Sequence, residues 1–158
     1  MSYPLTIPKI DPTTKDAIID TLYRACLSYD LNDVSLHDSA FVDSSETSFD
    51  MSGIATYKGL DEIRKIHSNV GPLDTTHLVT NPRIVEYDEV KGTARLTAST
   101  VAQHFRKGEG NKGDAEKLMT GSLYDMDLVR EGEGVWKVMH FRMKVVWREG
   151  DQSVVFGS

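Results

Sequence analysis

The chain has 158 residues and a formal net charge of −6, with 39% hydrophobic and 27% charged residues. This composition fits one globular domain and excludes a disordered or collagen-like chain. The acidic excess without a basic patch argues against a nucleic-acid partner. No apolar run reaches the roughly 20 residues that span a bilayer, and the start of the chain lacks a signal-peptide pattern. The single cysteine allows no intrachain disulfide, so we expect a soluble, cytoplasmic protein without a membrane partner.

The first half of the chain has helical periodicity. Thr13 follows an Asp-Pro turn and begins a capping-box pattern, after which apolar side chains recur at three- and four-residue steps up to Tyr29. This pattern predicts an amphipathic helix over residues 13–29 with one buried stripe: Ile18, Leu22, Ala25, Cys26 and Tyr29. We further expect a short helix over 34–41, a strand over 47–51 and a helix over 59–70, which Gly71-Pro72 ends.

After Pro72 the period changes from 3.6 to 2, which is typical of strands. Strands are predicted over residues 75–81, 83–89, 93–107, 117–130 and 135–148, with turn-like residues between them. Helices followed by a meander indicate an α+β fold, with the helices packed on one face of an antiparallel sheet. The longest strands predict a strongly bent sheet with a pocket at its mouth. We expect one domain over 1–158, with only residues 1–10 and 149–158 peripheral.

Two histidines are predicted to face this pocket. The strand from Thr93 presents mainly small side chains on one face and ends that face with His104. Such a face packs poorly unless large neighbours fill the space, and the alternative is a cavity. His77 lies at about the same level on the preceding strand. Histidine can act as an acid or a base at neutral pH, although either side chain can instead have a purely structural role.

The carboxylates that could serve these histidines are Asp30 and Asp125. Asp30 can alternatively cap the helix that begins near Val34. Asp125 can alternatively pair with a basic residue on a neighbouring strand. The other three histidines have no distinguishing context and are taken as structural, and Cys26 is taken as a packing residue. Because metal-ligand spacings and phosphate-binding glycine loops are absent from the sequence, we expect no metal and no organic cofactor.

Four short stretches resemble one family when they are taken together and in order. They are Ser28-Tyr29-Asp30-Leu-Asn-Asp33, Thr75-Thr-His77, Val101-Ala-Gln-His104 and Gly134-Val-Trp136-Lys-Val138. They resemble scytalone dehydratase and the wider SnoaL-like branch of the NTF2-like superfamily over residues 15–148. The resemblance implies a cone-shaped α+β barrel. It also implies a cofactor-free dehydratase or isomerase that acts on a hydroxylated carbonyl, polyketide-like small molecule in a biosynthetic pathway.

The resemblance also implies roles for particular residues. Asp30 would orient and tune His77, and His77 with His104 would perform the proton transfers. Tyr29 would hold a water molecule or donate to the substrate carbonyl. Phe49 and Asp50 lie nearest to a tyrosine of the family, and Asp125 lies where the family has an asparagine, so these three are assigned to substrate binding.

The sequence also leads to expectations about oligomeric state and about alternative functions. The resemblance favours a homo-oligomer, a trimer before a dimer, and the apolar face of Tyr124, Met126 and Leu128 is expected to be the outer one, covered by a helix or another subunit. A cyclase or an epoxide-opening enzyme could use the same pocket. A non-catalytic module for ligand binding or oligomerisation is the other alternative, since fold alone does not determine function.

Overall fold

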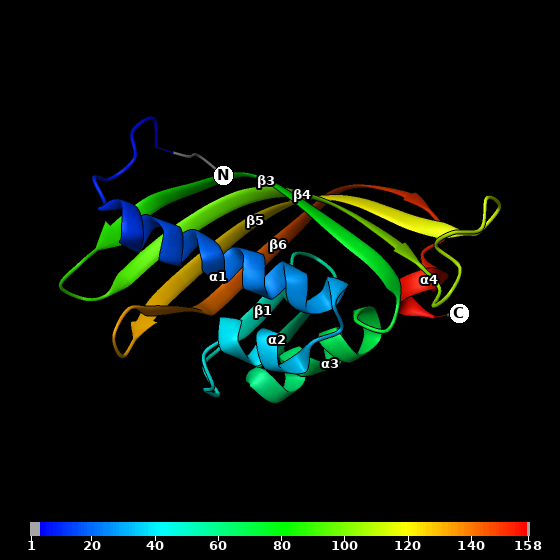
Figure 1. Ribbon diagram of the computed structural model, residues 1–158, viewed down its shortest axis with the longest axis horizontal. Helices are drawn as coiled ribbons and strands as arrows, with labels where there is room; N and C mark the ends of the chain where they lie inside the picture. The colour runs from blue at the N-terminus through cyan, green and yellow to red at the C-terminus, as the bar shows by residue number, and fades with distance from the viewer. Residues whose placement is uncertain (1–3, 158) are drawn as a thin grey trace.

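The computed structural model describes residues 4–157 and has the predicted order, helices first and a long meander afterwards (Figure 1). The elements are α1 (Pro12–Asp30), α2 (Val34–Ala40), β1 (Ser48–Met51), β2 (Ala55–Lys58), α3 (Leu60–Val70), β3 (Asp74–Asp88), β4 (Thr93–Phe105), β5 (Lys117–Glu131), β6 (Val135–Gly150) and α4 (Ser153–Phe156). In this part of the chain, no helix is both long and apolar enough to cross a membrane.

All strands belong to one sheet with the order β2-β1-β6-β5-β4-β3. The neighbours are antiparallel except β1 and β6, which run parallel. Figure 1 shows the long strands curving over α1, which crosses their concave face. The α+β class and the curved sheet are therefore confirmed. The barrel is not closed, because β2 and β3 form the two ends of the strand order in the described chain.

Two strand predictions differ from the structure. The segments 75–81 and 83–89 form one strand, β3, whose register shifts between Thr80 and Arg83. Proline has no N–H for the ladder, and the irregularity at Asn81-Pro82, where Asn81 has a φ of 55°, lets the strand continue past it. Strand β2 was not predicted, since four residues carry too little periodicity to be recognised.

The core lies between α1 and the concave face of the sheet. The predicted stripe of α1 is buried, and small side chains on β4, including Ala94 and Ala98, leave room for the helix. On β5, Tyr124, Met126 and Leu128 join this core. The expectation that they form the outer face is therefore wrong, although their burial against a helix is observed.

We expected the C-terminal segment to be peripheral, but it packs against the rest of the molecule. Strand β6 continues to Gly150, and α4 packs at the end of the sheet with Val154 buried (Figure 1). Arg106 on the β4 side fastens this segment, since one guanidinium nitrogen donates to Asp151 Oδ2 at 3.1 Å and to Ser153 Oγ at 2.8 Å. The apolar residues of α4 cover this end of the sheet, where Val155 and Phe156 line a pocket.

Candidate active site

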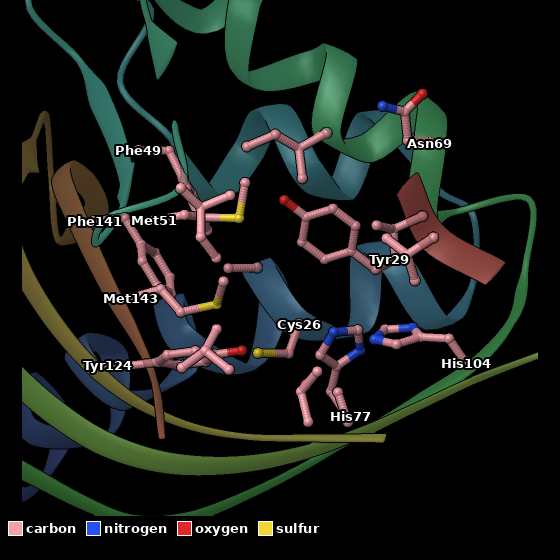
Figure 2. Close-up of a pocket in the computed structure, with 18 of the residues that line it drawn as sticks. Cys26, Tyr29, Phe49, Met51, Asn69, His77, His104, Tyr124, Phe141 and Met143 are labelled. Atoms are coloured by element: carbon pink, nitrogen blue, oxygen red, sulfur yellow. The ribbon is translucent and has the colours of Figure 1, made fainter. Parts of the chain in front are cut away.

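A pocket opens between α1, the concave face of the sheet, α3 and α4 (Figure 2). Its volume of about 120 Å³ is close to the roughly 150 Å³ cavity that can hold a benzene molecule. Most of the lining is apolar, with Phe49, Met51, Phe141 and Met143 along one side. A few polar groups converge on it, and this combination is typical of small-molecule sites.

Asp30 and His77 meet at this pocket. Helix α1 ends at Asp30, and the next helix is capped by Asp33, whose side chain accepts from the Leu36 N–H at 3.0 Å. Asp30 is therefore not the cap of α2. Its Oδ2 accepts from the backbone N–H of His77 at 2.9 Å, and its Oδ1 lies 2.6 Å from His77 Nδ1. The predicted hydrogen-bond contact between Asp30 and His77 is confirmed.

This contact defines the form of the imidazole. An ionised carboxylate only accepts hydrogen bonds, so Nδ1 of His77 carries the proton. In the neutral form of the ring, Nε2 is then the atom without a proton, and the ring lines the pocket. The side chains of His77 and Asp30 are only 9% and 14% exposed. The pair is thus a largely buried base with a fixed tautomer and a negative charge behind it.

His104 lies beside His77 and has a different hydrogen-bond partner. The two rings are 5.6 Å apart in an edge contact, and His104 Nδ1 is 2.7 Å from Thr75 Oγ1 across the β3–β4 pair. Burial, together with the positive charge that His77 carries once it is protonated, lowers the pKa of His104 from 6.5 to about 4. His104 is therefore neutral at neutral pH, where it can form hydrogen bonds but does not act as a cationic acid.

Tyr29 supplies an unpaired hydroxyl. Its ring packs against His67 and His77, with centroids 5.4 and 5.7 Å away. The hydroxyl is buried and has no hydrogen-bond partner among the described residues. Figure 2 shows it directed away from the two histidines toward the side formed by Phe49 and Met51. Since burial raises the pKa of Tyr29, the group stays protonated and is available as a donor.

The three residues assigned to substrate binding have different positions. Phe49 lines the pocket and stacks on Phe141 with centroids 4.5 Å apart. Asp50 does not line it, and its Oδ1 accepts from Thr56 at 3.1 Å. Asp125 is on the outer face of the sheet, where it binds Arg95 and Arg142. The assignments of Asp50 and Asp125 are wrong because successive strand residues point to opposite faces, and Phe49 and Tyr124 occupy the inner one.

Several residues that line the pocket were not predicted from the sequence. Tyr124 was placed on the wrong face, and the mouth contains Asn69 of α3, Arg148 of β6 and Phe156 of α4. The apolar Val-Val-Phe run near the C-terminus was a signal for α4. Arg148 had no such signal, because its direction depends on an irregularity in β6. Within residues 4–157, no three His, Cys, Asp or Glu side chains gather closely enough to hold a metal ion.

Comparisons with known proteins identify the family of this chain and one relative. The family model of the SnoaL-like domain matches residues 13–142. The chain is 34% identical to the terrestric acid biosynthesis cluster protein E of Penicillium crustosum over 142 residues, which cover 89% of this chain and 88% of that protein.

Solved structures show the same fold. A candidate scytalone dehydratase from Novosphingobium aromaticivorans superimposes with a TM-score of 0.72 at 17% identity, covering 87% of each chain. Hexachlorocyclohexane dehydrochlorinase LinA-type3 from Novosphingobium barchaimii superimposes with a TM-score of 0.69 at 20% identity, covering 89% of this chain and 92% of that one. With the domain match spanning most of its length, the chain belongs to the SnoaL-like family and has the NTF2-like fold.

Proposed function

We propose that this protein is a cofactor-free dehydratase or isomerase that acts on a small hydroxylated carbonyl compound. The observation that carries the proposal is the Asp30–His77 pair, whose free Nε2 belongs to a residue lining an apolar pocket. Two proteins of similar fold have names that describe elimination reactions, a dehydratase and a dehydrochlorinase. The relative in a biosynthesis cluster supports a small metabolite as the substrate class.

The reaction begins with proton abstraction. His77 Nε2 removes a proton from the carbon next to the substrate carbonyl, and the electron pair of that C–H bond moves onto the carbonyl oxygen as an enolate. The imidazolium that forms is stabilised by Asp30, 2.6 Å from Nδ1. The buried hydroxyl of Tyr29 donates a hydrogen bond to the developing enolate oxygen. The low polarity of the pocket strengthens both interactions.

Dehydration is completed when the enolate collapses. Its electron pair forms the C=C bond, the bond from the β-carbon to the hydroxyl oxygen breaks, and the leaving oxygen takes a proton and departs as water. Protonated His77 supplies that proton, because the lowered pKa of His104 leaves His104 neutral. His104 instead hydrogen-bonds the leaving group. Isomerisation shares the first step and differs in returning the proton to another carbon.

A fluorescence assay with a model substrate tests this proposal. Loss of water from 3-hydroxy-1-tetralone gives 1-naphthol, which fluoresces, and deuterium exchange next to the carbonyl of 1-tetralone in D₂O reports the first step alone by NMR. His77→Ala should lower both rates by about 10² to 10⁴, the usual contribution of a positioned acid-base group. His140→Ala is the matched control, since His140 bonds Ser48 and does not line the pocket. Equal rates for wild type and His77→Ala in both assays would contradict the proposal.

A further inference from the structure

Arg148 reaches the pocket because of a bulge in β6. Met143 and Val145 line the pocket, and a regular strand would turn Arg148 to the outer face. The pairing shifts at this point: Val145 is opposite Ser122 but Trp147 is opposite Gly121, so Val146 is one extra residue. The extra residue inverts the alternation, and Arg148 lines the pocket. Bulges next to active sites commonly redirect a side chain in this way.

The residue that follows the extra residue packs on a glycine of the neighbouring strand. The indole of Trp147 lies against Gly121, where an added Cβ would be 2.1 Å from Trp147 Nε1. Atoms cannot approach so closely, so any side chain at position 121 would displace the indole. Gly121 thus leaves the space that the indole of Trp147 occupies beside the bulge.

The charge of Arg148 is unbalanced at this site. No Asp or Glu lines the pocket. Five other arginines form ion pairs with carboxylates, namely Arg24, Arg64, Arg95, Arg106 and Arg142. In the described chain, Arg148 instead donates to the neutral Gln152 Oε1 at 3.2 Å. A protein with a net charge of −6 thus presents a cation at the mouth of its pocket.

We propose that Arg148 is an anion-binding subsite, and that the substrate carries an acidic group, a carboxylate or an acidic enol, at the end remote from the reacting bond. The inference rests on the proposed function, because it names the substrate class of the same pocket. An arginine fork binds a carboxylate or an enolised dicarbonyl through parallel hydrogen bonds. Holding the anion at the mouth leaves it partly hydrated, while the neutral part enters the apolar interior. Asn69 lines the same pocket and adds an amide donor.

A pair of matched probes tests the subsite without catalysis. 2-Naphthoate and methyl 2-naphthoate share one ring system and differ in charge, and their binding is measured by isothermal titration calorimetry. Wild type should prefer the carboxylate about fivefold to tenfold, as expected for a partly hydrated charge-assisted contact. The preference should fall as salt is added. Arg148→Gln should abolish it while leaving the affinity for the ester unchanged, which shows that the pocket remains folded.

Two control variants separate this inference from the proposed function. Arg130→Gln removes an arginine that bonds the backbone oxygen of Glu89 away from this pocket, and it should keep the preference for 2-naphthoate. His77→Ala should also keep it, because the base is not needed for binding the anion. The subsite is refuted if wild type shows no preference, or if Arg148→Gln retains it. Either result leaves the role of His77 to be decided by the rate assays.

Discussion

Asp30 and Asp125 are both largely buried carboxylates with basic partners, and they lie on opposite sides of the same sheet. Asp30 accepts from the backbone of His77 and contacts its ring on the pocket side. Asp125 is 3% exposed and binds Arg95 through both oxygens, at 2.9 and 2.6 Å, and Arg142 at 3.0 Å on the outer side. Burial and pairing alone therefore do not distinguish a functional carboxylate from a structural one.

The difference lies in the partner. Histidine is a side chain that can serve as an acid or a base in catalysis, and His77 belongs to the lining of a cavity. Arg95 and Arg142 stay charged at every accessible pH, and neither lines that cavity. Burial raises the pKa of Asp125, but the hydrogen bonds and charges of the two arginines outweigh it and lower the pKa below 3.8. Asp125 thus stays an anion that ties three strands together.

The largest expected effect separates the two carboxylates by activity. Asp30→Asn keeps the shape but removes the charge that stabilises protonated His77, so kcat should fall on the order of 10²-fold with little change in KM. Asp125→Asn should leave kcat and KM of the folded protein unchanged. Both are measured with the dehydration assay after circular dichroism confirms folding. Equal losses of kcat in the two variants would remove the distinction.

The second expected effect is on the stability of the fold, which should depend on pH through His104 on the pocket side and through Asp125 on the outer side in different pH ranges. The pKa of His104 falls from 6.5 to about 4 on folding. Between pH 6.5 and 4, His104 is therefore protonated in the unfolded chain but neutral in the folded protein. Stability should therefore decline as pH falls from 6.5 to 4, by up to roughly 3 kcal/mol. The lowered pKa of Asp125 contributes only as pH falls below about 4.

Urea denaturation at a series of pH values measures this difference. His104→Gln should reduce the decline between pH 6.5 and 4, and His37, whose pKa burial also lowers, accounts for the decline that remains. Its matched control, His140→Gln, should keep the decline. A wild-type profile that is flat down to pH 4 would show that His104 titrates normally in the folded protein.

The smallest expected effect concerns the outer cluster. Asp125→Asn should lower the free energy of unfolding by about 1–2 kcal/mol, because two arginines lose a carboxylate but remain partly hydrated. Their side chains are 34% and 38% exposed. Asp127→Asn is the control, since Asp127 is itself 39% exposed and pairs only with Arg142. An unchanged denaturation midpoint for Asp125→Asn would show that the cluster adds no stability.

Much of the fold follows from periodicity. The stripe from Ile18 to Tyr29 is buried as predicted, and the change of period after Pro72 marks where the sheet begins. Residue patterns within one segment gave a wrong strand boundary where pairing with a neighbouring strand determines the boundary. Asn81-Pro82 is read as a break because proline stops a ladder, yet pairing with β4 continues on both sides of it.

The candidate site also has a part that the sequence predicted and a part that it left open. Residue type and strand alternation identify His77, His104 and Asp30 as candidates, because few side chains can move a proton at neutral pH, and the family resemblance adds Tyr29. Which carboxylate serves a histidine was left open, since the alternation of β5 is the same whichever face is inner.

The sequence by itself determined the fold class and the chemistry available, because periodicity and ionisable groups are properties of the chain. Only the tertiary structure decided the direction of each side chain. Packing against α1 turned Tyr124 inward and Asp125 outward, and the capping of α2 by Asp33 left Asp30 free for His77. The bulge at Val146 turned Arg148 into the pocket. A strand exchanges its two faces with a shift of one residue, and only contacts distant in sequence select between them.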